Sequence, residues 1–237
     1  MSLDRVAREP GDRRTHGITA LLLTLLVSSV LCVAIVELRN RYQHDTYYRF
    51  LDWNLFLAWI PVVFALGVFA SARRGKRLVA WVLAVPWLLF FPNAPYLLTD
   101  FIHLQESPAV PLWYDGLMLS AFAWTALALG FASLFLMQSV VRAAAGTAAS
   151  WLGVVAVLAL GSFGVYIGRF IGFNSWDALL HPGRVADVID HRVQSNPRLI
   201  GSMLALTGFL TVAYAVYYCF ARLRLELDRP SRAQQPL

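Results

Sequence analysis

Residues 91–104, FPNAPYLLTDFIHL, bring several polar side chains into an otherwise apolar part of the chain. If this stretch is helical, Tyr96, Asp100 and His103 lie at positions i, i+4 and i+7 and share one face. An aspartate and a histidine one turn apart can form an acid–base pair, or can bind a metal ion together with a third ligand such as Asp52, Asp115 or Asp177. We expect instead a structural hydrogen bond between Asp100 and His103, and no metal.

Two prolines interrupt the helical pattern just before these residues. Pro92 and Pro95 lack a backbone N–H, and each disfavours helical geometry in the residue before it. We therefore expect the third membrane helix to break at FPNAP. The N-terminus of a second half-helix would be a favourable place for an anionic group. The alternative is a proline kink that serves packing only.

A second polar stretch, GSFGVYIGRFIGFNSWD, covers residues 161–177. Gly164, Gly168 and Gly172 are four residues apart, a spacing that predicts a groove for close approach of another helix. Arg169 lies beside this groove. Its guanidinium could reach the lipid headgroups, pair with an acid, or hold a carboxylate or phosphate in a bidentate fork. We favour pairing with an acid, for which Asp100, Asp115 and Asp177 are the candidates.

These polar residues gather at one end of the expected bundle and define a candidate site. An ordinary aromatic belt with solvated loops is the alternative interpretation. The candidate catalytic residues, which are acids and one histidine, are Asp100, His103, Asp115 and Asp177. The candidate ligand-binding residues are Asn93, Tyr96, Thr99, Arg169, Asn174 and Trp176.

The composition predicts that membrane helices position this site. Of 237 residues, 58% are hydrophobic and only 14% are charged, and the mean hydropathy is +0.58. A soluble core of this size could not bury so much apolar surface, so much of it must face lipid. The apolar segments, each long enough to cross the hydrocarbon core, are 17–36, 54–72, 78–98, 114–137, 150–171 and 199–220. We expect an all-α membrane protein with about six transmembrane helices, because lipid leaves only helices or closed barrels and the alternation typical of a barrel is absent.

The positive charges predict the orientation of the chain. With six crossings, 13 Arg and Lys residues lie on the side of both termini and seven on the other side. The positive-inside rule then places both termini in the cytoplasm. Residues 1–16 and 221–237 are expected to be cytoplasmic tails around a transmembrane domain, 17–220. In the long fifth loop, 178–198, the apolar spacing predicts an amphipathic helix on the outer surface.

The composition offers few signs of a cofactor. Cys32 and Cys219 lie inside apolar segments and are expected to be packing residues. Four of the five histidines fall in tails or loops, which argues against haem, and the cofactor is otherwise unknown. The net charge of +6 reflects basic residues at helix ends, so we expect the lipid bilayer and no nucleic acid as a partner.

Four stretches resemble a bacterial family of multi-pass membrane proteins, the domain of unknown function 1361. They are WNLFLAWIP at 53–61, FPNAPYLLTDFIHL at 91–104, WYDGLMLSAFAWTALALG at 113–130 and GVYIGRFIGFNSWD at 164–177. The resemblance covers about residues 50–200. It implies a protein of the bacterial cytoplasmic membrane, and it assigns no catalytic residue.

Three functions fit these observations. The first is a membrane partner or assembly protein whose polar outer pocket docks another protein. The second is a membrane-embedded enzyme that acts on a lipid-linked or envelope substrate, although HExxH and GxSxG motifs are absent. The third is a small-molecule transporter, for which the chain shows neither an internal repeat nor a polar path on the cytoplasmic side.

Overall fold

The described residues of the computed structural model, 10–104, 110–172, 183 and 198–227, contain helices and no strand. The predicted all-helical class is therefore confirmed for this part of the chain. Within this described part, five helices are long and apolar enough to cross a membrane: Gly17–Gln43, Tyr47–Arg73, Arg77–His103, Leu112–Arg169 and Ile200–Leu223. The amphipathic helix expected at 178–198 lies almost entirely outside the described residues.

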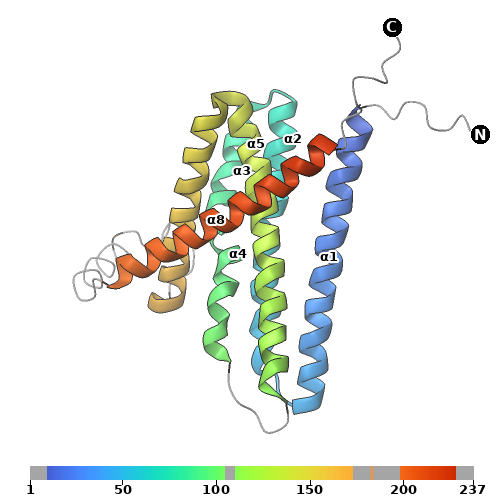
Figure 1. Ribbon diagram of the computed structural model, residues 1–237, viewed down its shortest axis with the longest axis vertical. Coiled ribbons are helices and arrows are strands. Elements are labelled where there is room, and N and C mark those ends of the chain that lie inside the picture. Colours follow the sequence, from blue (N-terminus) through green and yellow to red (C-terminus); the bar gives the residue numbers. More distant parts are fainter. Residues whose placement is uncertain (1–9, 105–109, 173–182, 184–197, 228–237) are drawn as a thin grey trace, which may run out of the picture.

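The first two helices run antiparallel and are joined by a short turn. Helix α1 (Pro10–Gln43) leads through a 3-10 turn, η1 (Tyr47–Arg49), into α2 (Phe50–Arg73) (Figure 1). The predicted first segment ends at residue 36, whereas α1 continues to Gln43. This extension places Arg39 within the helix rather than in a loop, and it brings the side chain to the start of α5 (Leu112–Tyr166).

The third membrane segment is assembled from three helical pieces. Helix α3 (Arg77–Phe90) is followed by the four-residue α4 (Asn93–Tyr96) and a 3-10 helix, η2 (Leu97–His103). Phe91 and Pro92, which join α3 to α4, keep right-handed helical dihedral angles, with φ −53° and ψ −40° for Phe91 and φ −59° and ψ −20° for Pro92. The chain thus stays right-handed helical through FPNAP, and its helix type changes to 3-10 after Tyr96.

Helix α5 runs along the bundle and then turns back. Gly146, with φ 85° and ψ 179°, interrupts its helical dihedral angles. Figure 1 shows the two arms of α5 meeting at the end of the bundle where α2 joins α3. The second arm continues into a π-helix, η3 (Ile167–Ile171), which ends at Gly172 in the left-handed conformation, φ 79°. Helix α8 (Arg198–Leu227) crosses the bundle obliquely.

The core divides into two clusters that share α2 and α5. One cluster packs α1, α2, α4 and the first arm of α5, with Leu51, Ala58 and Ala126 almost fully buried. The other packs α2, α3, α5 and α8 around Phe91, Leu210 and Tyr214. Many large apolar side chains on the outer surfaces of the helices stay exposed in the isolated chain, as expected for surfaces that meet lipid.

The FPNAP segment packs closely between the two arms of α5. An added Cβ at Gly130, on the first arm, would lie 2.8 Å from the Cβ of Ala94. An added Cβ at Gly164, on the second arm, would lie 2.7 Å from Cγ of Pro92. The predicted close approach at Gly164 is therefore confirmed, and its partner is the proline turn. Gly172 does not extend this groove, because it terminates the π-helix.

Replacing Gly164 with alanine is expected to lower the free energy of unfolding by about 1–3 kcal/mol, because the methyl group would overlap the rigid ring of Pro92. The matched control is Gly153→Ala, on the same arm, where an added Cβ meets nothing within 4 Å. Since alanine is the better helix former, this control is expected to be neutral or slightly stabilising. Unfolding of the detergent-solubilised variants followed by circular dichroism measures both, and equal effects would contradict the proposed contact.

Candidate functional site

Arg169 forms the centre of the first polar cluster. Its Nη2 bonds to Oδ1 of Asp100, its Nε donates to Oγ1 of Thr99 at 2.8 Å, and its Nη1 contacts Nε2 of His103 at 3.0 Å. Its guanidinium carbon also lies 4.2 Å from the centre of the Tyr96 ring, within cation–π range. One arginine therefore contacts four side chains of the FPNAPYLLTDFIHL segment, and the predicted pairing with an acid is made with Asp100.

The helix types of two segments explain this convergence. In a 3-10 helix residues i and i+3 eclipse one another, so η2 brings Asp100 and His103 onto one line. Arg169 lies in the π-helical turn η3, an element that occurs often at functional sites. The guanidinium lies between Asp100 and His103 and joins them. The expected direct hydrogen bond between these two residues is replaced by this arginine bridge.

Asp100 is completely buried and is satisfied on both oxygens. Oδ1 accepts from Arg169, and Oδ2 lies 3.4 Å from Nδ2 of Asn54 on α2. Thr99 completes the cluster: its hydroxyl accepts from Arg169 and donates to the carbonyl oxygen of Tyr96 at 2.7 Å. Isolated charges are costly to bury, and this arrangement supplies the opposite charge and the hydrogen bonds that offset the cost.

A second buried ion pair lies nearby and was not expected from the sequence. Arg39 donates from Nε and Nη2 to the two carboxylate oxygens of Asp115, at 2.8 and 3.2 Å, in a bidentate fork. Its Nη1 donates to Oδ1 of Asp45 at 3.0 Å. The guanidinium carbon lies 4.3 Å from the centre of the Tyr48 ring. Asp115 is fully buried, and Arg39 is 5% exposed.

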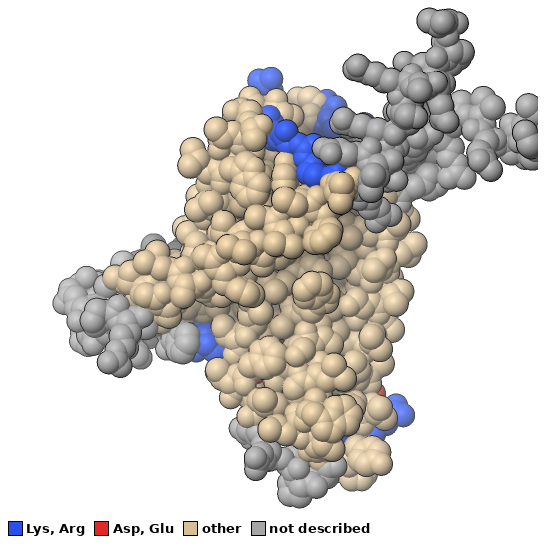
Figure 2. Space-filling model, viewed as in Figure 1, with Lys and Arg blue, Asp and Glu red and all other residues tan. Residues whose placement is uncertain are grey.

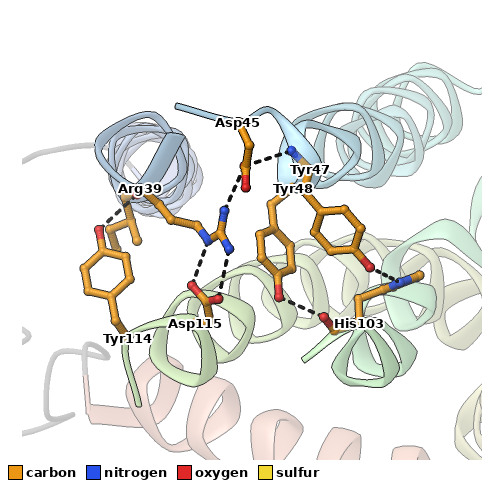
Figure 3. A network of polar contacts seen from close by, with 8 residues as sticks. Arg39, Asp45, Tyr47, Tyr48, His103, Tyr114 and Asp115 are labelled. Carbon is orange, nitrogen blue, oxygen red and sulfur yellow. Dashed lines mark hydrogen bonds and ion pairs between the residues drawn. The ribbon is translucent and has the colours of Figure 1, made fainter. Parts of the chain in front are cut away.

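Two tyrosines of η1 lie between the Arg39–Asp115 pair and His103, as Figure 3 shows. The hydroxyl of Tyr48 donates to the carbonyl oxygen of His103 at 2.8 Å. The hydroxyl of Tyr47 lies 3.4 Å from Nδ1 of the same residue. Since a guanidinium can only donate, Nε2 of His103 accepts from Arg169, and a neutral ring then carries its proton on Nδ1, toward Tyr47. We call this connected set the ion-pair network; its members are Arg39, Asp45, Tyr47, Tyr48, Asn54, Tyr96, Thr99, Asp100, His103, Asp115 and Arg169.

The structure brings some of the predicted site residues together and places others elsewhere. Asp100, His103, Tyr96, Thr99 and Arg169 come together around one guanidinium. Asp115 belongs to the network through Arg39 instead. Asn93 contributes to the helix joint, where its amide donates to the carbonyl oxygen of Phe90 at 2.9 Å. The remaining candidates, Asn174, Trp176 and Asp177, lie outside the described residues.

Arg39, Asp45 and Tyr48 are absent from the predicted site although they are central to the network. Arg39 counts only as a loop charge when the first helix is ended at residue 36. Its position at the end of a long apolar run was the available signal, since an arginine at that depth needs a partner. Among the described residues no three His, Cys, Asp or Glu side chains are grouped closely enough to hold a metal ion. Cys32 and Cys219 are both free.

A bundle of apolar helices of membrane-spanning length, with buried arginine–aspartate pairs at one end, is consistent with the class of multi-pass membrane proteins. The family model for the protein of unknown function DUF1361 matches residues 53–213. The chain belongs to this family, and the resemblance found in its motifs is confirmed. The match includes Asp100, Asp115 and Arg169. No curated protein and no solved structure matches the chain.

Proposed function

We propose that this chain is a non-catalytic component of the bacterial cytoplasmic membrane that docks a partner protein at its outer end. The observation that carries the proposal is the saturation of the ion-pair network. Asp100 and Asp115 are fully buried and accept on both oxygens. Both ring nitrogens of His103 are also engaged. A general base must lie within reach of a substrate proton, and burial keeps both carboxylates from one in this arrangement.

The proposal includes six membrane crossings with both termini in the cytoplasm. Its support is the length of the Leu112–Arg169 segment, which has 58 residues. A straight helix of that length would extend about 87 Å, against a hydrocarbon core of about 30 Å. The non-helical dihedral angles of Gly146 divide it into two arms. In this proposal each arm crosses the membrane once. The excess of positive charge then assigns the end that carries RRGKR, residues 73–77, to the cytoplasm.

The proposed docking surface lies beside the ion-pair network. A shallow depression of about 250 Å³ is lined there by charged and polar side chains from the end of α1, from η1 and from the turn between them, namely Glu37, Asn40, Arg41, His44, Asp45, Thr46 and Arg49. Three exposed aromatic side chains belong to neighbouring helix ends: Tyr42 in the last turn of α1, Tyr47 in η1 and Trp113 in the first turn of α5. Aromatic residues and arginine are the types enriched at protein interfaces. A rigid buried network beneath such a surface fixes the geometry that a partner would recognise.

Site-specific photo-crosslinking in cells tests this function. A photoreactive residue at exposed Thr46, in the depression, is expected to give one adduct of defined mass. The same residue at lipid-facing Val85, which is 64% exposed on α3, is the matched control and is expected to give none. Exchanging the charges of the exposed Glu37–Arg41 pair, by Glu37→Arg with Arg41→Glu, should remove the adduct while the fold is kept.

Two outcomes would contradict the docking function. One is an absence of adducts at Thr46, or equal adducts at Thr46 and Val85. The other is a lipid-linked species that stays bound to the purified protein in native mass spectrometry and is lost in Asp100→Asn. That second outcome would instead favour the enzyme acting on an envelope substrate.

A further inference from the structure

A separate polar cluster lies toward the opposite end of the bundle from the ion-pair network, between α5 and α8. Nη1 of Arg142, one turn before Gly146, donates to the hydroxyl oxygen of Tyr218 at 2.6 Å. Nε of Arg222 donates to the same oxygen at 3.0 Å. Two cations therefore converge on a single uncharged oxygen. We call Gln138, Arg142, Tyr214, Tyr218 and Arg222 the arginine–tyrosine cluster.

Among the side chains that the structure describes, which end at Leu223 in α8, no carboxylate pairs with either arginine. The ion pairs found there use Arg39, Arg41 and Arg169, and neither Arg142 nor Arg222 forms one. Two guanidinium groups that share a neutral acceptor repel one another, and an anion placed between them would remove that repulsion. The contrast with the ion-pair network, where each buried arginine has its own aspartate, makes this cluster suited to an anionic partner.

The remaining hydrogen-bonding groups of the cluster are also donors. A tyrosine oxygen has two acceptor positions, and the two arginines occupy both at Tyr218, so its hydrogen is left to donate. One turn before Arg142, the Gln138 side chain is 3% exposed and accepts from Tyr214 at 2.7 Å through Oε1. Its Nε2 is buried and has no hydrogen-bond partner. A site made of unused donors fits an oxygen-rich anion.

The position of the cluster suggests where such an anion comes from. Figure 2 shows Lys and Arg gathered at the end of the molecule where α2 joins α3, the end toward which Arg142 lies. Below this end, the face in view is largely without Lys, Arg, Asp or Glu. Arg142 and Arg222 are half-buried, so an interfacial group can reach them from the membrane surface. Basic pockets between membrane helices are suited to anionic headgroups.

We infer that the arginine–tyrosine cluster binds a phosphate group, supplied by an anionic lipid headgroup of the adjoining leaflet. Arg142 and Arg222 bind the phosphate oxygens, and the Tyr218 hydroxyl donates a further hydrogen bond. The bound lipid fixes α8 against the turn of α5. This site is independent of the docking surface, since it lies toward the other end of the bundle and shares no residue with it.

Lipid binding by the full chain, delipidated in a maltoside detergent, tests the inference. Dioleoylphosphatidylglycerol is added, and native mass spectrometry counts the bound lipid while the apparent unfolding temperature is followed. The wild type is expected to retain one lipid and to be stabilised by it. The double variant Arg142→Gln with Arg222→Gln is expected to bind roughly tenfold or more weakly, because charge-assisted hydrogen bonds are lost. The matched control, Arg73→Gln with Arg74→Gln, removes two charges near the same end and should bind as the wild type does.

Further experiments distinguish the possible sources of the phosphate group and control for misfolding of the variants. Dioleoylphosphatidylcholine, which has no net charge, should bind more weakly than the phosphatidylglycerol. Sodium phosphate that displaces the lipid and stabilises the protein alone would assign the site to a soluble phosphate. Tyr218→Phe removes only the shared hydroxyl and keeps the test valid if the double variant does not fold; it should also weaken binding. Equal phosphatidylglycerol binding by the wild type and the folded arginine or tyrosine variants would overturn the inference.

Discussion

Truncation of Arg169 to alanine is expected to lower the free energy of unfolding by about 3–5 kcal/mol. The reason is that Asp100, which is completely buried, would lose the main group that balances its charge. Removal of the guanidinium also leaves the Thr99 hydroxyl and Nε2 of His103 without their donor. Unfolding of the protein in mild detergent, followed by circular dichroism and by protease resistance, measures the effect.

A matched control and a paired variant test whether the loss of stability comes from the buried ion pair. Arg41→Ala removes an arginine whose ion pair with Glu37 is exposed, so a loss below about 1 kcal/mol is expected. Arg169→Gln combined with Asp100→Asn removes both charges together and should be less damaging than Arg169→Ala. If Arg169→Ala were as mild as Arg41→Ala, the buried pair would not be the main support of this end of the bundle.

Replacing Arg39 with alanine is expected to have an effect of the same size, about 3–5 kcal/mol, since it leaves the fully buried Asp115 unpaired. A double-mutant cycle with Arg39→Ala and Asp115→Asn should yield a coupling energy of about 1.5–3 kcal/mol, because the fork makes two charge-assisted hydrogen bonds. The same unfolding measurement applies to all three variants.

Arg39→Lys separates charge from geometry in this second pair. A lysine keeps the positive charge, but a single ammonium group cannot reproduce the planar fork to Asp115 while it also donates to Asp45. An intermediate loss, smaller than that of alanine, is therefore expected. If lysine restored full stability, the bidentate geometry would be irrelevant and only the charge would matter. A coupling energy near zero would show that the two residues act independently.

The ion-pair network explains why the polar residues do not by themselves indicate an enzyme. Asp100 and His103 have types and spacing suited to acid–base chemistry. In the folded chain, however, one guanidinium engages both. Their reactivity is set by a residue about seventy positions away in the sequence, and no local pattern reports that contact.

Much of the architecture follows from local properties of the chain. Hydropathy identifies the apolar segments because each side chain contributes to the transfer free energy independently of its distant neighbours. The motifs also identify the family, and the cost of a charge in lipid predicts that Arg169 finds an acid. Gly164 is recognised as a close-approach position from its type and spacing alone.

Contacts between distant segments were decided by the tertiary structure. Whether Arg169 meets Asp100, Asp115 or Asp177 depends on which segments are neighbours, and the sequence leaves all three pairings open. The extension of α1 to Gln43 depends on a partner 76 positions away, because Asp115 and the Tyr48 ring stabilise Arg39 inside the bundle. The 3-10 and π-helical turns that aim the side chains have the same origin. Their small local costs are offset only once the buried ion pairs and the glycine contacts have formed.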